Sequence, residues 1–330
     1  MNAKLTQTKF NLLRTLQRFM VAFFMLFSSI WLAGSVSAQT SGGISITSEN
    51  FVLKGDISER EGKRLVTELE IFRRSLFKMV GEDYQTEENR VKVFAFKNTN
   101  IYQSVVNNKT AAGVYRPTPN GAVFVLNAQG GFKEGEPARR VAFHEFVHHI
   151  IATYTGQKFP RWYNEGYANF LANFKIKRNK FIIGVPDRNY AWYVNNQGWM
   201  PMDTLVGSVK RYPFTLGSNL SSQKNTQNAF YAQSWLAVTY LQTHPEYARK
   251  SGEYLQRVDR GEDSLQAFKT AMGMTPDEFG QILKKFSKKG IYKQYPFPLE
   301  KKVLKPAMQV EKLGEVEMNI AVSEAIKLFK

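Results

Sequence analysis

The sequence predicts an α+β fold, in which a small mixed sheet with helices precedes a mostly α-helical C-terminal half. Two short apolar runs, Val91–Phe96 and Ala122–Leu126, have the composition of strands. Apolar residues recur at helical spacing before the first run and after the second. From Ala229 onward almost every stretch has this spacing, which places the helical half in the C-terminal part of the chain.

Residues 1–38 have the pattern of a secretory signal peptide. Four basic residues precede an apolar stretch from Phe19 to Gly34, and small residues form a cleavage pattern that ends at Ala38. We therefore expect export, to the periplasm or the extracellular space. If the segment stayed uncleaved, it would tether the protein to a membrane. No later segment has the roughly 18 consecutive apolar residues that a membrane span needs.

Residues 39–50 are predicted to be a linker, and residues 51–175 the α+β part. Phe51–Gly55 has the pattern of a strand, and Ser58 caps a helix that continues to Gly81. The apolar residues of this helix recur every three or four positions, at Leu65, Leu69, Phe72, Leu76 and Met79. Residues 98–108 favour a short helix, and turn residues at 117–121 precede the strand Ala122–Leu126.

Two consecutive helices follow a Gly- and Glu-rich loop at 130–136. Pro137 suits the first turn of the first helix, and Gly156 is predicted to end it. Pro160 marks the start of the second helix, which we expect over residues 161–174.

Residues 176–290 are predicted to be mostly helical. A strand at Phe181–Val185 is followed by loops rich in Tyr, Asn and Ser. Helices are then expected at 229–243, 247–258 and 264–271, and a last one opens with the capping box Thr275–Glu278. We place one domain at 51–290 and a charged C-terminal tail, with one helix near its end, at 291–330.

Composition and charge restrict the class of protein. The 43% hydrophobic and 14% aromatic content is typical of a globular protein. The absence of cysteine excludes disulfides, so any metal site must use His, Glu, Asp or water. The net charge is +17, of which residues 1–38 contribute four charges, leaving +13. This excess favours contact with an anionic envelope surface, or else forms a solvated lysine-rich surface. Because export is predicted, we expect no nucleic-acid partner.

The run Val141–Ile151 contains the motif His144-Glu145-x-x-His148. Histidines four positions apart on a helix lie on one face, so both imidazoles can reach a single metal ion. Glu145 is placed to take the proton of a water held by that metal. The combination predicts zinc-assisted hydrolysis with one Zn²⁺ ion.

The apolar pattern around the motif favours a site over two core histidines. The pattern consists of Phe143, Val147, Ile150 and Tyr154. These apolar residues would be buried on one side of the helix, which would place the two histidines at the edge of a cleft. A catalytic zinc site needs a third protein ligand and an open position. Glu165 lies 17 positions after His148 on the next predicted helix, and the small Gly166 and Ala168 permit a close helix approach. We therefore predict His144, His148 and Glu165 as the metal ligands.

These residues resemble the gluzincin metallopeptidases, in which a His-Glu-x-x-His motif precedes a ligand glutamate. Within that family, His144-Glu-x-x-His148 with Trp162-x-x-Glu165-Gly-x-Ala168 is similar to the aminopeptidase-like branch and to the exported bacterial peptidase MA-like proteins. The resemblance, over residues 50–290, implies a zincin-like fold with Glu145 as general base. The segment by which aminopeptidases grip a free amino terminus is absent, so exopeptidase specificity is not implied.

The resemblance also implies two further site residues. A tyrosine from a later helix stabilises the oxyanion in that family, and the segment Phe230–Trp235 is similar to this region, so Tyr231 is the candidate. Tyr231 could instead only pack; its rivals are Tyr190, Tyr193, Tyr212 and Tyr240. Asn169 lies four positions after Glu165, where related enzymes carry a carboxylate that orients a zinc histidine. For His149 we expect an exposed spare imidazole rather than a proton shuttle.

The sequence thus predicts an exported zinc metallopeptidase that hydrolyses peptide bonds of a peptide or protein substrate. Two alternatives remain open: a non-catalytic zinc-containing binding protein of the envelope, and a hydrolase of a non-peptide amide such as a cell-wall cross-link. Glu145 favours catalysis, because a structural zinc site needs no base. The strand Ala122–Leu126 either pairs with an extended peptide or is buried in the sheet.

Overall fold

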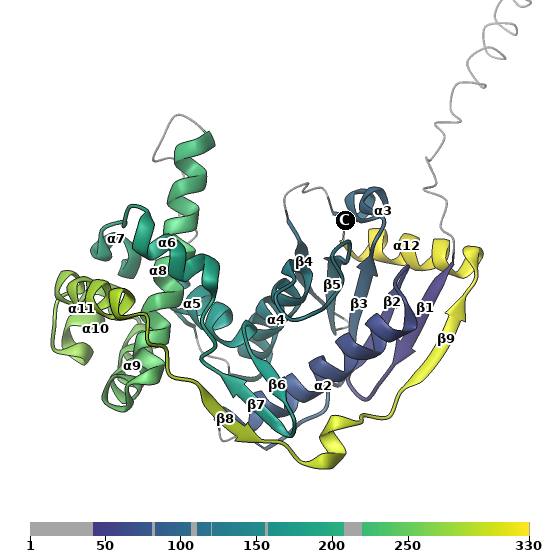
Figure 1. Ribbon diagram of the computed structural model, residues 1–330, viewed down its shortest axis with the longest axis horizontal. Coiled ribbons are helices and arrows are strands. Elements are labelled where there is room, and N and C mark those ends of the chain that lie inside the picture. The colour runs from purple at the N-terminus through teal and green to yellow at the C-terminus, as the bar shows by residue number, and fades with distance from the viewer. Residues whose placement is uncertain are drawn as a thin grey trace, which may run out of the picture. The chain divides into compact units, whose positions relative to one another are not determined.

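A six-stranded mixed sheet forms the first layer of the protein, with the strand order β4-β5-β3-β2-β1-β9 (Figure 1). The computed structural model describes residues 42–80, 83–106, 111–119, 121–155, 158–207 and 220–329. Pairing is parallel between β2 and β3 and between β3 and β5, and antiparallel elsewhere. The strands are β1 (Gly43–Thr47), β2 (Phe51–Gly55), β3 (Val91–Phe96), β4 (Gly113–Thr118), β5 (Gly121–Asn127) and β9 (Gln309–Leu313).

Helices cover both faces of this sheet. On one face lie α2 (Glu59–Val80) and α4 (Pro137–Ile150), where the ring of Phe146 from α4 contacts Phe51 of β2 and Phe72 of α2. On the other face lies α12 (Glu315–Phe329), with α3 (Thr99–Val105) beside it. There Glu324 of α12 bridges Lys54 and Lys92, at 2.8 Å from each.

The helical half packs on α4 through α5 (Arg161–Ala172), which lies between α4 and the long helix α8 (Leu220–Thr243) (Figure 1). The other helices of this half are α6 (Arg188–Asn196), α7 (Met202–Val206), α9 (Pro245–Asp259), α10 (Ser264–Met272) and α11 (Pro276–Lys289). A second, three-stranded sheet adjoins them, with β6 (Lys175–Lys177), β7 (Lys180–Ile183) and β8 (Tyr295–Pro298). A mixed sheet followed by a helical half agrees with the predicted α+β class.

Most predicted elements occur where we expected them. The strands at 51–55 and 91–96 are found as predicted, and the long helix spans Glu59–Val80. The capping box of α11 is confirmed, because the Thr275 hydroxyl and the Glu278 carboxylate each bind the other residue's backbone N–H. Gly156 lies outside the described residues, but α4 continues into a π-helical turn, Ile151–Thr155. None of the helices within the described ranges is long and apolar enough to cross a membrane.

Two of the predicted domain boundaries are wrong. Residues 43–47, predicted to be part of a linker, form β1, and residues 291–330, predicted to be a tail, contain β8 and β9 as well as the predicted helix near the end, α12. The strands β1 and β9 pair with each other, so each satisfies backbone groups that the other would leave exposed. The compact unit therefore spans residues 40–330, whereas the predicted signal peptide lies outside the described residues.

Two further segments differ from the prediction. The loops expected after residue 185 contain α6, whose start is capped by the Asp187 carboxylate, and α7. The turn expected at 117–121 is shorter, because β4 extends to Thr118 and pairs back with β5 at Gly121. The segment Ala122–Leu126 therefore lies between β3 and β4 and has no open edge for a peptide. The outer strand on this side of the sheet is β4.

Candidate metal centre

The two motif histidines converge from one face of α4. Pro137 occupies the first turn of this helix, where its missing N–H costs no hydrogen bond. Four positions separate His144 from His148, and their Nε2 atoms lie 3.1 Å apart. The ring planes are nearly perpendicular, at 88°. Both rings therefore direct the same nitrogen toward one point.

Glu165, on α5, approaches the same point from the neighbouring helix. Its Oε2 atom lies 3.2 Å from Nε2 of His144 and 3.5 Å from Nε2 of His148. One ligand atom from each of the three residues falls within 4.8 Å of the others. The structure thus brings together all three predicted ligands, and among the described residues they are the one His/Asp/Glu group with this geometry.

Two asparagines of α5 hold the outer nitrogens of the histidines. The Asn169 side chain donates from Nδ2 to the Glu165 carbonyl oxygen at 2.9 Å, which turns its Oδ1 toward Nδ1 of His144 at 3.1 Å. Asn164 places its Oδ1 3.2 Å from Nδ1 of His148. Because an amide oxygen only accepts, each Nδ1 carries the hydrogen. The lone pairs of both histidines are therefore on Nε2, directed at the shared point.

The charges at this point fit a divalent cation. The Oε2 atom of Glu165 is buried and has no hydrogen-bond donor in the described part of the protein. Burial alone raises the pKa of Glu165, but the proximity of His144 and His148 lowers it far below its ordinary value. Two imidazole nitrogens and one carboxylate oxygen are a donor set that zinc takes in catalytic sites, with the fourth position open.

Glu145 lies on the side of α4 that faces β4. It belongs to a stripe with Val141, which fills the space beside Gly113 of β4, and with His149. Burial raises the pKa of Glu145, and the charge of Glu165 adds to this effect, whereas His144 and His148 lower it. The carboxylate thus has the elevated proton affinity that suits a general base.

The charge of Glu145 affects the pKa of three tyrosines. Burial raises the pKa of Tyr102 on α3 and of Tyr115 on β4 to about 12, and the negative charge of Glu145 contributes to both shifts. Burial also raises the pKa of Tyr231 on α8, with contributions from Glu165 and then Glu145. All three hydroxyls therefore remain protonated near neutral pH and can donate hydrogen bonds.

Tyr231 and Tyr190 are the two predicted oxyanion candidates that adjoin the site. The Tyr190 hydroxyl, from α6, donates to Asn169 Oδ1 at 3.5 Å. It therefore contacts the residue that orients His144. The Tyr240 ring stacks on His244 and meets Phe286 edge-on, so it is packed in another aromatic cluster. Tyr212 lies outside the described residues, and burial accounts for the raised pKa of Tyr193. Tyr231 stays the predicted candidate, because the Tyr190 hydroxyl already contacts a residue that orients His144.

We expect Asn169→Ala to weaken zinc binding by about 10–100-fold, because His144 loses the group that fixes its tautomer and ring orientation. The measurement is zinc affinity by competition with a chelator. Asn196→Ala on α6 is the matched control, since Asn196 makes the same bond to the carbonyl four residues before it but contacts no histidine. Equal zinc affinity in both variants would contradict an orienting role.

The small residues of α5 allow α8 to come close to the ligand helix. A methyl group at Gly166 would overlap the Ser234 carbonyl group and contact Val238 on α8. The Trp162 ring, one turn earlier, is fully buried and donates to the Tyr254 hydroxyl at 3.0 Å. The close approach at Gly166 is therefore to the backbone of α8, whereas the sequence predicted it toward the helix that carries His144 and His148.

Gly166→Ala is expected to lower the free energy of unfolding by about 1–3 kcal/mol, because the added methyl group has no space. The same change in an unhindered helix raises stability by about 0.5–1 kcal/mol. Gly252→Ala on α9 provides that comparison, since nothing lies within 4 Å of the added carbon. Urea unfolding of both variants measures the difference. If both changes raised stability, the contact between α5 and α8 would be looser than described.

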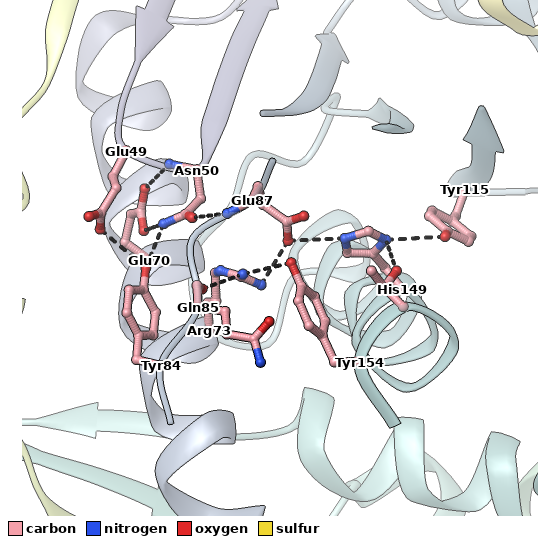
Figure 2. A network of polar contacts seen from close by, with 11 residues as sticks. Glu49, Asn50, Glu70, Arg73, Tyr84, Gln85, Glu87, Tyr115, His149 and Tyr154 are labelled. Atoms are coloured by element: carbon pink, nitrogen blue, oxygen red, sulfur yellow. Dashed lines mark hydrogen bonds and ion pairs between the residues drawn. The ribbon is translucent and has the colours of Figure 1, made fainter. Parts of the chain in front are cut away.

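A buried polar network joins α4 to α2 and β4 (Figure 2). His149 is only 4% exposed, so the expectation of an exposed imidazole is wrong. Its Nε2 donates to Glu87 Oε1 at 3.1 Å, and its Nδ1 lies 3.2 Å from the Tyr115 hydroxyl. Arg73, fully buried on α2, pairs with Glu87 at 2.7 Å and donates to the Tyr154 hydroxyl at 2.8 Å. The network ties α2, α4 and β4 together.

Asn164 is the site residue that the sequence reasoning missed. Once Glu165 faces α4, the residue before it lies about 100° away around the helix and can reach the second histidine. Helix geometry alone could therefore have indicated it. Tyr102 and Tyr115 had no such signal, because their positions depend on how β4 and α3 pack. No protein-family model matches the chain, and no curated protein matches it significantly.

Proposed function

We propose that this protein is a zinc-dependent hydrolase that cleaves peptide bonds. One observation carries the proposal: the Nε2 atoms of two histidines and the Oε2 atom of Glu165 meet within 4.8 Å, with both outer nitrogens held by asparagines. Three protein ligands leave one position open, as in catalytic zinc sites, whereas structural sites have four. This favours a hydrolase over a protein with a purely structural ion.

His144, His148 and Glu165 would hold the ion. When bound, zinc would polarise a carbonyl group and make a water molecule acidic near neutral pH. Glu145 would take the proton of that water and pass it to the leaving amine, since its buried carboxylate adjoins the ligands. The Tyr231 hydroxyl, protonated because burial raises its pKa, would donate a hydrogen bond to the oxyanion of the tetrahedral intermediate.

The position of β4 supports a peptide as the substrate. This strand pairs with β5 on one side and has no partner strand on the other within the described chain. Tyr115, on the side of β4 that faces α4, is close enough to Glu145 for the two groups to interact electrostatically. An extended peptide could therefore add to β4 with its backbone beside the proposed base.

The test is cleavage of a proteome-derived peptide mixture by residues 39–330 loaded with one equivalent of zinc, read by mass spectrometry. We expect cuts that disappear when a chelator removes the ion and return when zinc is restored. Bound zinc without any cuts would contradict peptide hydrolysis. The same sample would then be incubated with cell-wall fragments, where release of amino groups would indicate a non-peptide amide substrate and no release would indicate a binding protein.

A further inference from the structure

The positive charge of the chain is concentrated in two segments. Residues 175–188 contain five basic residues and one acidic residue, and residues 284–305 contain eight basic residues and one acidic residue. Their combined excess of 11 is most of the +13 carried by residues 39–330. The remaining sequence is therefore almost neutral, and the basic character of the protein is local.

The two segments meet in the three-stranded sheet, where β7 pairs with β8. On the inner face of β7, Phe181 and Ile183 are buried against the core. On the outer face, Lys177 of β6 is the direct partner of Lys180, and Lys180 is the partner of Pro298 on β8. The outer face therefore presents the exposed side chains of Lys177 and Lys180 to solvent.

This outer face continues onto α6 and the end of α11. Gln294 lines a shallow hollow with Lys177 and Lys180, and it also lines a second hollow with Arg188 at the start of α6. Further along α6, Asn195 donates to the Ser287 carbonyl oxygen at 3.5 Å, which joins α6 to the last turn of α11. Lys288, Lys289 and Ile291 follow directly.

Two large apolar side chains are exposed close in the chain to Arg188 and Lys288. Trp192 lies one turn after Arg188 on the exposed side of α6 and is 57% exposed, and Ile291 is 71% exposed. Lys177, Lys180 and Lys288 make no ion pair within the described part of the chain, whereas Lys175 is paired with Glu134. Lysines without ion pairs, together with an exposed tryptophan and isoleucine, are the composition of a surface that lies on a membrane interface.

We propose that the outer face of β6-β7-β8, with α6 and the end of α11, docks onto an anionic lipid bilayer. The lysines would bind lipid phosphates, and Trp192 and Ile291 would enter the headgroup region. A soluble acidic polymer would use the cations alone, so the apolar side chains favour the bilayer. The surface contains none of the metal ligands, and the proposal therefore does not depend on the proposed hydrolysis.

The experiment measures binding of residues 39–330 to vesicles of phosphatidylcholine with and without phosphatidylglycerol. These residues contain the whole compact unit, and they omit the apolar stretch of residues 19–34, which could bind lipid by itself. We expect binding only to the anionic vesicles, and its loss as salt rises. The triple variant Lys177→Gln, Lys180→Gln, Lys288→Gln should bind about 100-fold more weakly.

Two comparisons distinguish binding through this surface from a general attraction caused by the net charge of the protein. The control triple variant Arg249→Gln, Lys269→Gln, Lys312→Gln removes the same charge from exposed sites outside the two segments and should bind like the wild type. Trp192→Ala should weaken vesicle binding by about tenfold while leaving the salt dependence unchanged. Equal losses in both triple variants, or binding to soluble polyglutamate but not to vesicles, would overturn the proposal. So would a Trp192→Ala variant that binds vesicles like the wild type.

Discussion

Glu145→Gln is expected to lower the rate of peptide hydrolysis by about 10²–10⁴-fold and to leave zinc affinity nearly unchanged. Glutamine keeps the size of the side chain but cannot accept a proton from water. The three ligand atoms belong to other residues, so the ion should still bind. The measurements are kcat/KM for a peptide that the wild type cleaves and the zinc content of the purified variant.

The His144→Ala variant distinguishes a metal ligand from the general base, because it should lose both the zinc ion and the hydrolytic activity. Tyr231→Phe should lower kcat by a smaller factor, about 10²–10³, if its hydroxyl donates to the oxyanion. A Glu145→Gln variant with wild-type activity would refute the assignment of the base. Loss of zinc from that variant would instead mean that Glu145 contributes to the ion site.

Arg73→Met is expected to lower the free energy of unfolding by about 3–5 kcal/mol, because it leaves the buried Glu87 carboxylate without its cation. Burial by itself raises the pKa of Glu87, but His149 and then Arg73 lower it below its ordinary value, so the group is ionised at neutral pH. The Glu87 side chain is 6% exposed and that of Arg73 is 0% exposed, so solvent cannot replace the lost partner. Urea unfolding of the zinc-free protein measures the effect.

The neighbouring Arg74 provides the matched control. Its ion pair with Glu49 is at the surface, where the two side chains are 33% and 46% exposed, and Arg74→Met should cost less than about 1 kcal/mol. The double variant Arg73→Met, Glu87→Gln should recover part of the loss, because the unpaired charge is removed with its partner. Equal losses for Arg73→Met and Arg74→Met would show that burial of the network does not matter for stability.

The sequence predicts the elements that have a strong local pattern and misses those that depend on distant partners. The helix Glu59–Val80 and the strand Val91–Phe96 follow from their own apolar spacing. By contrast, Gly43–Thr47 is short and follows Ser and Gly residues, and it is a strand because β2 and β9 pair with it. Pro117 indicates a turn, yet β4 tolerates it because an outer strand can lack one backbone donor.

The same distinction applies to the site. The residues that the structure brings together, His144, His148 and Glu165, are fixed by helical spacing and one short connection. His149 was expected to be exposed because α4 alone does not reveal Glu87, which comes from the loop before β3 and accepts the hydrogen bond of the buried imidazole. The environment of Tyr231 depends on how α8 crosses α5, and no pattern within either helix predicts that crossing.

The pairing of β1 with β9 has a consequence for how the protein folds. Ile44 and Lys312 are partners across roughly 270 intervening positions, so closing this loop costs more chain entropy than any neighbouring strand pair. We expect the sheet to form first from β2, β3 and β5 and to gain β9 late, since non-local pairings slow folding. Until then β1 would expose a row of unpaired backbone groups, so an intermediate without β9 would be prone to aggregate through that strand.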